Sequence, residues 1–209
     1  MSGNTDGPSF SNNEIEKLLK NYKLKYYKSK NLSKEVANFL NQGKIVGWFQ
    51  DRMEFGQRSL GNRSIICDPR KKSFQDKVNK AVKFRETFRP FAPAVLEEYA
   101  SKIFEMPKKR KVYFMERVYK IKKEWRKKIP AVTHVDGTGR IQTVNKQIHK
   151  KFYKLINEFY QISNVPVLMN TSFNLNGEPI VMSPEHAIKT FFSCGLDTLV
   201  IEDYIVEKK

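Results

Sequence analysis

Short apolar runs separate longer amphipathic segments along most of the chain. The runs are rich in β-branched and aromatic residues, and their length suits strands better than helices. We therefore predict strands at 45–49, 65–67, 91–96, 166–169, 198–201 and 204–206. The run IVGWF at 45–49 is expected to be a buried strand, because it is too short and too rich in β-forming residues to be helical.

The amphipathic segments carry the start and stop signals of helices. Ser11 and Glu14 form a capping box that opens a first helix, and a second helix starts near Ser33 and stops at Gly43. Ser183 is the N-cap of a last helix. Two further helices are predicted over 74–82 and in the segment that carries Ile148, Phe152, Leu155 and Phe159 on one face.

Strands that alternate with helices predict an α/β or α+β fold with a mixed, twisted sheet. A chain of 209 residues with 40% hydrophobic composition fits one domain spanning 1–209. The segment 107–128 differs from its surroundings, since it holds the runs KKRK and KKEWRKK among aromatic residues. We expect it to be an exposed basic insertion or lid.

The charge of the chain favours anionic partners. It holds 39 Lys and Arg against 22 Asp and Glu, a net charge of +17, which suits nucleotides, nucleic acid or an acidic protein surface. Cys67 and Cys194 form no C-x-x-C pair, so a disulfide framework and a zinc site are not indicated. With no signal-peptide pattern and no apolar run long enough for a membrane span, a cytoplasmic location is expected.

Arginines lie beside glycines in the first of three unusual loops, RMEFGQRSLGNRS at 52–64. Gly56 and Gly61 allow close backbone approach, and Arg58 and Arg63 can each form two hydrogen bonds to a phosphate or carboxylate. The alternative is that Glu54 pairs with a neighbouring arginine at the surface, which contributes little.

The second loop is KFRETFRPF at 83–91. In a strand, Lys83, Arg85 and Arg89 would share one face and could converge on one polyphosphate. A charged edge strand is the alternative.

The third loop, NTSFN, supplies Asn170, Ser172 and Asn174, which can hydrogen-bond phosphate, ribose or a carbonyl. An ordinary Asn/Ser turn is the alternative. In HVDGTGR, Asp136 could orient a nitrogen-bearing group or Mg²⁺ and Arg140 could bind another phosphate. A tight turn capped by Asp136 explains the same residues without a ligand.

These motifs together resemble the C-terminal domain of the NodU/CmcH carbamoyltransferases. The resemblance covers nearly the whole chain and rests on GWFQDRMEFGQRSLGNRSI, KFRETFRPFAP, AVTHVDGTGRIQTV and PVLMNTSFNLNGEPIV. It implies a YrdC-like fold with a twisted open mixed sheet flanked by helices. It also implies that ATP, with Mg²⁺, and carbamoyl phosphate are used to form carbamoyl adenylate.

The resemblance also implies site residues. The Lys-x-Arg and Ser-x-Asn signature of YrdC-like proteins falls on Lys83 with Arg85 and on Ser172 with Asn174. Gln57 and Ser59 depart from the family pattern, which has proline and alanine there, but Arg58 is kept. The expected catalytic residues are Arg58, Lys83 and Arg140; the nucleotide- or phosphate-binding residues are Arg63, Arg85, Arg89, Asn170, Ser172 and Asn174; and His134 and Asp136 are expected to orient the carbamoyl group or Mg²⁺, with no direct protein cluster for a metal.

Members of the resembled family carry a further actin/hexokinase-like half, in which the carbamoyl group passes to a hydroxyl acceptor. These residues cannot supply it, so the expected partner is a separate transferase half or subunit, and a homodimer is left open. The alternative is a basic YrdC-like nucleotide- or RNA-binding module without catalysis, which would use the lysines and aromatic residues of 107–128. Nucleic acid is not the partner that we expect.

Overall fold

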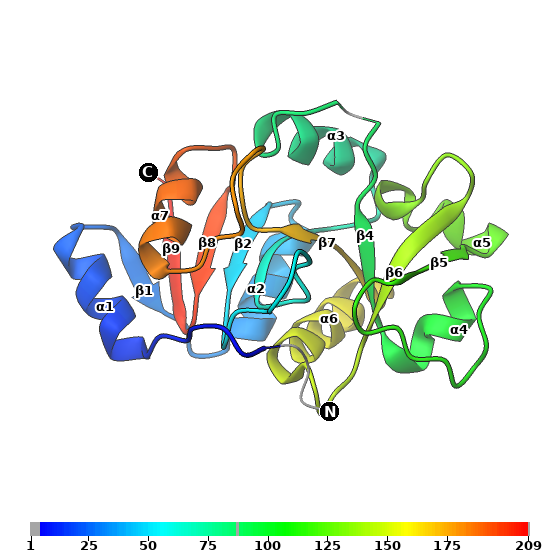
Figure 1. The fold of residues 1–209 in the computed structure, drawn as a ribbon, viewed down its shortest axis with the longest axis horizontal. Helices are drawn as coiled ribbons and strands as arrows, with labels where there is room; N and C mark the ends of the chain where they lie inside the picture. The colour runs from blue at the N-terminus through cyan, green and yellow to red at the C-terminus, as the bar shows by residue number, and fades with distance from the viewer. Residues whose placement is uncertain (1–4, 87, 209) are drawn as a thin grey trace.

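A computed structural model describes residues 5–86 and 88–208 of the chain. Its strands form one open sheet, nine-stranded within this described part, in the order β1-β9-β8-β2-β3-β7-β4-β6-β5 (Figure 1). The strands are β1 (Tyr26–Lys28), β2 (Val46–Phe49), β3 (Arg63–Cys67), β4 (Ala92–Leu96), β5 (Arg117–Lys120), β6 (Thr138–Val144), β7 (Val167–Ser172), β8 (Thr198–Ile201) and β9 (Tyr204–Glu207).

Parallel and antiparallel pairs both occur in this sheet. β2 pairs in parallel with β8, and β4 pairs in parallel with β6, whereas the other neighbours are antiparallel. Every residue of β2, β3, β4 and β8 is buried. The predicted mixed sheet with flanking helices is confirmed.

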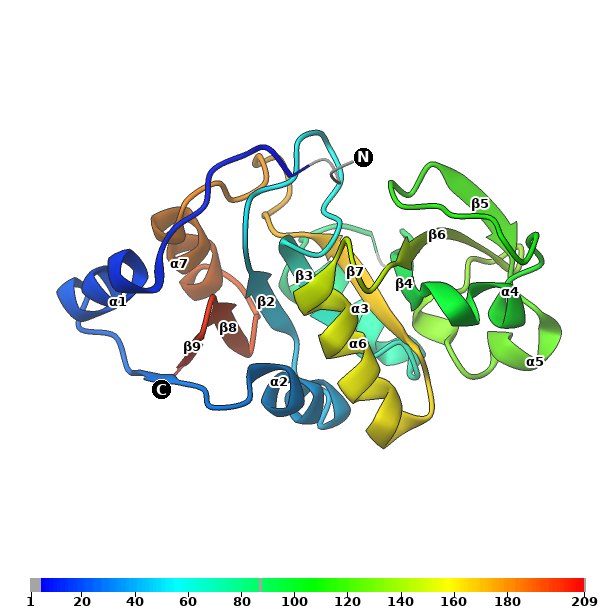
Figure 2. The same cartoon turned by 90° about the horizontal axis from the view of Figure 1, so that it is seen from below.

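Helices cover both faces of the sheet. α2 (Leu32–Asn41) and α6 (Lys150–Ser163) pack against each other on one face, and α1 (Asn12–Asn21) and α7 (Pro184–Phe192) lie on the opposite face (Figure 2). The remaining helices are α3 (Lys72–Ala81), the short α4 (Ala100–Ile103) and α5 (Lys123–Arg126), and two 3₁₀ turns at Glu97–Tyr99 and Pro130–Val132. In the described part of the chain, no helix is long and apolar enough to cross a membrane.

Local signals set the helix ends. The Ser11 side chain accepts a hydrogen bond from the backbone N–H of Glu14, whose carboxylate accepts from the Ser11 N–H, so the predicted capping box is present. Ser183 caps α7 through the N–H of His186. Asn164 ends α6 in the left-handed conformation, with φ of 56°.

Gly61 lies where the arginine-rich loop at 52–64 packs against helix α6. Its φ is +115°, and a Cβ atom at this position would lie 2.3 Å from Cδ1 of Phe152. Its carbonyl also accepts a 2.8 Å hydrogen bond from the indole N–H of Trp48. Glycine is required here by both conformation and space, and the contact fixes the loop against α6.

The basic segment 107–128 is built into the sheet. β5 pairs along its length with β6, and Val112 exchanges hydrogen bonds with Thr143, as its N–H donates to Oγ1 at 2.9 Å and its carbonyl accepts from the Thr143 N–H at 2.7 Å. Val112 and Ile121 are fully buried, while Lys108, Lys109 and most other basic side chains of the segment are exposed. The segment is therefore anchored to the core through its apolar residues, and its role as an insertion or lid stays a prediction.

Candidate functional site

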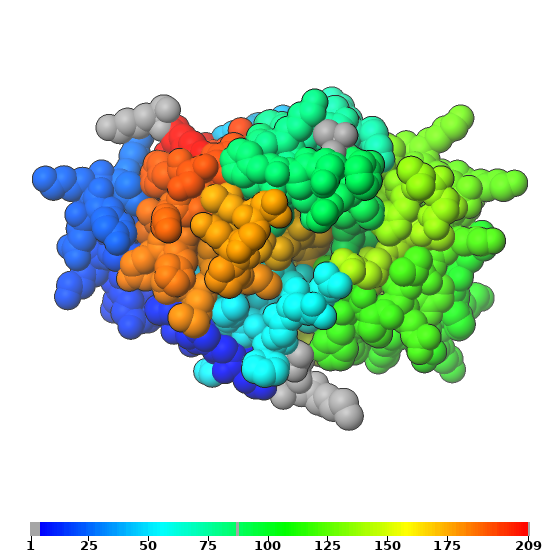
Figure 3. All heavy atoms as spheres, turned by 45° about the horizontal axis from the view of Figure 1, so that its top comes forward, coloured from blue at the N-terminus to red at the C-terminus, as the bar shows by residue number. Residues whose placement is uncertain are grey.

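The three unusual loops meet at one pocket of about 130 Å³. In Figure 3 a hollow lies between the loop at 51–62 (cyan), the segment before β4 (green) and the segment that follows β7 (orange). The pocket is lined by Gln57, Arg58, Ser59, Arg85, Pro90, Phe91, Ala92, Met115, Arg140, Asn170, Thr171 and Ser172. Five of the residues predicted from sequence, Arg58, Arg85, Arg140, Asn170 and Ser172, thus come together.

Three arginines give the pocket its charge. Among the described residues, none of Arg58, Arg85 and Arg140 forms an ion pair. Burial lowers the pKa of Arg140, and the nearby charge of Arg58 acts in the same direction. Burial also lowers the pKa of Arg85, and the charge of Arg89 adds to the effect. Unpaired cations that repel one another are stabilised by a bound anion, so the pocket favours a phosphate or carboxylate.

Arg85 is held in place by its neighbours. Its Nε donates to Oδ1 of Asn79 at 2.7 Å, and its guanidinium lies 4.9 Å from the ring centroid of Phe91. These two contacts hold in place the guanidinium of Arg85, which lines the pocket.

Lys83 lies behind the pocket wall and contacts protein oxygens. Its Nζ donates to the Ser172 carbonyl at 2.6 Å, to Asn174 Oδ1 at 2.7 Å and to the Asn174 carbonyl at 2.9 Å. Burial lowers the pKa of Lys83 to about 7, with a further contribution from the charge of Arg85. The structure therefore brings the Lys-x-Arg and Ser-x-Asn motifs into direct contact, with Lys83 joining the loop after α3 to the end of β7.

The prediction that Lys83, Arg85 and Arg89 share one face of a strand is wrong. Phe84 has a φ of 46°, and β4 begins only at Ala92. Arg89 instead forms an exposed 3.0 Å ion pair with Glu86 and does not line the pocket. A left-handed residue between Lys83 and Arg85 breaks the alternation on which the prediction depended.

Arg63 also lies away from the pocket. Its side chain is fully buried and donates to the carbonyls of Gln50, Asn62, Pro8 and Asp51 at 2.7 to 3.2 Å. The guanidinium carbon stacks 3.6 Å from the ring centroid of Phe49. The expectation that Arg63 binds phosphate does not fit these contacts, because protein carbonyls take up its terminal nitrogens.

Asp136 and His134 form a turn beside the pocket. Asp136 Oδ1 accepts from the Thr138 N–H at 2.9 Å and from its hydroxyl at 2.7 Å. His134 Nδ1 lies 3.3 Å from the same hydroxyl, and burial lowers the pKa of His134. Neither residue lines the pocket, so the alternative of a tight turn capped by Asp136 describes the geometry. Within 5–86 and 88–208, no group of three His, Cys, Asp or Glu side chains could hold a metal ion.

Gln142 supports the residues that line the pocket, although the sequence motifs did not single it out. It is fully buried in β6, and its Nε2 donates to the Leu60 carbonyl at 2.6 Å while its Oε1 accepts from Asn170 Nδ2 at 3.1 Å. A glutamine inside the strand-like run RIQTV was the available signal, since a buried amide needs polar partners.

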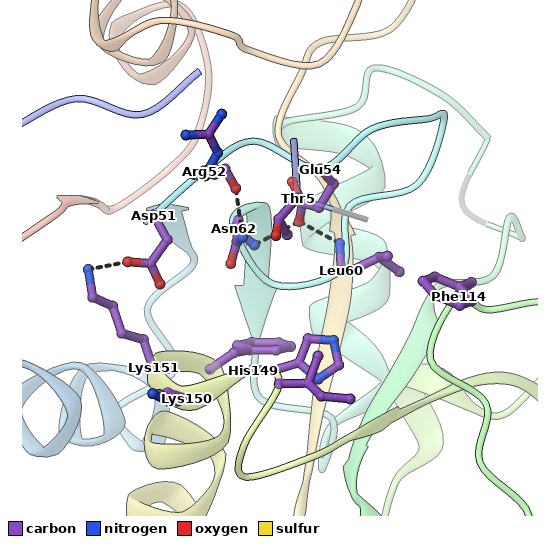
Figure 4. A pocket seen from close by; sticks show the side chains of 12 residues that line it. Thr5, Asp51, Arg52, Glu54, Leu60, Asn62, Phe114, His149, Lys150 and Lys151 are labelled. Carbon is purple, nitrogen blue, oxygen red and sulfur yellow. Dashed lines mark hydrogen bonds and ion pairs between the residues drawn. The ribbon is translucent and has the colours of Figure 1, made fainter. Parts of the chain in front are cut away.

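A second cavity, of about 240 Å³, lies on the α6 side of the loop at 51–62 (Figure 4). Within it, Glu54 Oε1 accepts from the N–H groups of Leu60, at 2.6 Å, and Asn62, at 2.7 Å. Lys151 bonds to Asp51 at 2.8 Å and also to Glu202. Glu54 therefore folds the loop rather than pairing with an arginine at the surface, and this cavity supports the loop from behind.

Comparison with known proteins gives the same family as the motifs. Residues 37–208 match the family model described as carbamoyltransferase C-terminus. Nodulation protein NolNO of Sinorhizobium fredii is 46% identical over 85% of this chain and 26% of its own length. Nodulation protein NolO of Bradyrhizobium diazoefficiens is 42% identical over 97% of this chain and 38% of its own length. The chain thus spans less than two fifths of the length of these relatives.

Solved structures share the fold at low sequence identity. Full-length HypF in its phosphate- and nucleotide-bound form matches with a TM-score of 0.58 and 20% identity, over 88% of this chain and 23% of HypF. Sua5 of P. abyssi in complex with L-threonine matches with a TM-score of 0.57 and 15% identity, over 82% of this chain and 46% of Sua5. The YrdC-like fold is confirmed.

Proposed function

The chain belongs to the carbamoyltransferase C-terminus family, and we propose that it forms carbamoyl adenylate from carbamoyl phosphate and ATP. The observation that carries this proposal is the convergence of Arg58, Arg85 and Arg140, all without ion-pair partners in the described part of the chain, on one small pocket. Substrates that carry several phosphate oxygens match this arrangement.

The reaction needs no side-chain nucleophile. Carbamoyl phosphate is hydrolysed to carbamate and phosphate, and a carbamate oxygen then attacks the α-phosphorus of ATP. The new P–O bond joins carbamate to AMP as the bond to pyrophosphate breaks. Such transfers depend on positioning and on neutralisation of charge, which arginines supply, and Mg²⁺ would enter with the nucleotide phosphates.

The pocket is too small to enclose both substrates. Its volume of about 130 Å³ lies well below the roughly 300–1,000 Å³ of pockets that enclose drug-sized ligands. We infer that the enclosed part holds carbamoyl phosphate or carbamate beside Arg58 and Arg140. The nucleotide then lies over the open side, near Arg85, Ser172 and Asn174, with Lys83 holding these last two residues in place.

Transfer to a hydroxyl acceptor is assigned to a separate half. The relatives NolNO and NolO are much longer than this chain, which leaves room for further domains in them. Phe84 and Phe88, in the same loop as the pocket residue Arg85, are 56% and 75% exposed. Exposed aromatic side chains next to a charged site are typical of a surface that a partner covers.

Calorimetry with a non-hydrolysable ATP analogue and Mg²⁺ tests the nucleotide site. We expect binding by the wild-type chain, and Arg85→Ala should weaken it by roughly 1.5–3 kcal/mol, the range for a lost charge-assisted hydrogen bond. Lys127→Ala, an exposed change in the basic segment, is the matched control and should leave affinity unchanged. No binding at millimolar nucleotide by a folded chain, or equal losses in both variants, would overturn the proposal.

A further inference from the structure

Three buried polar atoms of residues that line the pocket have no protein partner within the described part of the chain: Nε of Arg140, Oδ1 of Asn170 and Oγ of Ser59. Asn170 is 1% exposed and Ser59 is 3% exposed, and both line the pocket. Among the described residues, neither Oδ1 of Asn170 nor Oγ of Ser59 has a hydrogen-bond partner. A buried polar atom without a partner is destabilising. The two oxygens among them, beside three arginines, indicate that a ligand supplies the missing bonds.

The Asn170 amide is fixed in one orientation. Its Nδ2 donates to the Ser59 carbonyl and to Gln142 Oε1, each at 3.1 Å. Gln142 is fixed in turn, because its Nε2 donates to the Leu60 carbonyl at 2.6 Å. Rotation of the Asn170 amide would place its oxygen against two other oxygens. Oδ1 is therefore held as an acceptor, and it can pair only with a donor group.

The pocket thus requires a ligand of mixed character. Arginine side chains only donate hydrogen bonds, so Arg58, Arg85 and Arg140 bind anionic oxygens. Asn170 Oδ1 only accepts, so the same small ligand must also carry an N–H or O–H. Carbamoyl phosphate and carbamate have both features, since an NH₂ group lies on the carbon that bears the oxygens. Acetyl phosphate has the same shape but a methyl group in place of NH₂.

We propose that Asn170, oriented by Gln142 and assisted by the Ser59 hydroxyl, recognises the NH₂ of the carbamoyl group and thereby selects carbamoyl phosphate over acetyl phosphate. This inference rests on the proposed function. Asn170 and Ser59 are specificity-determining residues that touch the substrate, whereas Gln142 is a positioning residue that acts through Asn170. Discrimination by a buried acceptor is strong, because an analogue without the N–H leaves that acceptor unpaired.

Two stable phosphonates isolate the NH₂ group. Phosphonoacetamide and acetonylphosphonate replace the bridging oxygen of carbamoyl phosphate and acetyl phosphate by CH₂, and they differ only in NH₂ against CH₃. By calorimetry, we expect the wild-type chain to prefer the amide by about tenfold or more, the change that one hydrogen bond gives. Asn170→Leu should remove this preference, because it should weaken the binding of phosphonoacetamide and leave the binding of acetonylphosphonate unchanged. Affinity for inorganic phosphate should not change.

Ser59→Ala keeps the test valid if Asn170→Leu does not fold. Only an unpartnered hydroxyl is removed, while the Ser59 carbonyl that holds Asn170 remains. We expect a smaller loss of preference for the amide and no loss of stability. Asn38→Leu, an exposed change on α2, is the control that should keep the full preference.

The outcomes separate this inference from the proposed function. The inference alone is overturned if the wild-type chain binds the ATP analogue but binds both phosphonates equally. It is also overturned if Asn170→Leu and Ser59→Ala keep the preference for phosphonoacetamide. Weaker binding of inorganic phosphate to Asn170→Leu also overturns it, because Asn170 would then contact a phosphate hydroxyl. A folded chain that binds neither nucleotide nor either phosphonate overturns both proposals.

Discussion

Arg63 and Lys83 lie inside the protein although their motifs indicate ligand contacts. Arg63 is fully buried and Lys83 is 4% exposed. Backbone carbonyls accept the four hydrogen bonds of the Arg63 guanidinium, and two backbone carbonyls and two side-chain oxygens accept those of the Lys83 ammonium. These two cations therefore stabilise the loops from which the pocket is built, while Arg58, Arg85 and Arg140 line the pocket itself.

The role of Arg63 predicts a large effect on stability. Arg63→Met removes the donor from four carbonyls and should lower the free energy of unfolding by roughly 3–5 kcal/mol. Urea unfolding followed by circular dichroism measures this loss. Arg89→Met is the matched control, since its ion pair with Glu86 is exposed, and it should change stability by less than about 1 kcal/mol. Equal stabilities of the two variants would show that Arg63 does not hold the loop.

Lys83 predicts a pH dependence of stability. Burial places its folded-state pKa at about 7, below the unfolded value of about 10.4. Between these values the unfolded chain binds more protons than the folded chain, so the contribution of Lys83 to the free energy of unfolding increases as pH rises from about 7 to about 10. Below pH 7 the contribution is at its minimum.

Comparison of the wild-type chain with Lys83→Met isolates this effect from the other lysines. Urea unfolding at pH 7, 8, 9 and 10 should show that the difference in stability between the two grows with pH. A difference that shrinks over the same range would contradict the prediction. It would mean that the oxygens of Ser172 and Asn174 stabilise the ammonium form more than burial destabilises it.

The sequence predicted part of the site but did not predict the hydrogen bonds that orient Asn170. Arg58 and Arg140 could be found because cations close to glycines in loops are unusual. The resemblance singled out Lys83 with Arg85 and Ser172 with Asn174. The orientation of Asn170 depends on Gln142 and the Ser59 carbonyl, which lie on other strands and loops. Such a relay is set by tertiary packing, which no local pattern contains.

At the scale of elements, apolar runs predicted most of the buried strands but missed the largely buried β6, whose sequence TGRIQTV holds no apolar run, and both edge strands. β2, β3, β4, β7, β8 and β9 all overlap predicted runs. β5 was not predicted from the sequence, because it lies at the end of the sheet and only one of its residues, Tyr119, is half-buried while the others are exposed. β1 is only three residues long and largely exposed. Edge strands form through pairing with a neighbour, and their own composition gives little sign of it.

The anchoring of the basic segment predicts how it tolerates change. Val112→Ala removes buried methyl groups next to β6 and should lower the free energy of unfolding by on the order of 2 kcal/mol. Lys109→Ala, three positions away and exposed, should stay within about 0.5 kcal/mol of the wild-type chain. Thermal or urea unfolding measures both. A neutral Val112→Ala would indicate that 107–128 folds independently of the sheet.

At the scale of the whole molecule, the net charge of +17 acts together with the pocket. Long-range attraction speeds the approach of anions and weakens as salt screens it, whereas contacts inside a partly buried pocket are screened less. Nucleic-acid binding by the exposed lysines would instead fall steeply with salt. Salt dependence thus distinguishes the proposed nucleotide site from the alternative of an RNA-binding module.

The proposed division of labour between this chain and a separate half gives the last prediction. The residues at the pocket suit adenylate formation, and transfer is proposed for a separate half because the relatives NolNO and NolO are much longer than this chain. We therefore expect carbamoyl-phosphate-dependent exchange of labelled pyrophosphate into ATP, without carbamoylation of a simple alcohol or sugar by this chain alone. Arg140→Ala should reduce the exchange by roughly 10- to 100-fold, as expected for the loss of about 1.5–3 kcal/mol. Carbamoylated product from the isolated chain would contradict the division of labour. Absence of both exchange and product, with ATP analogue still bound, would mean that the partner half must complete the pocket before carbamoyl adenylate can form.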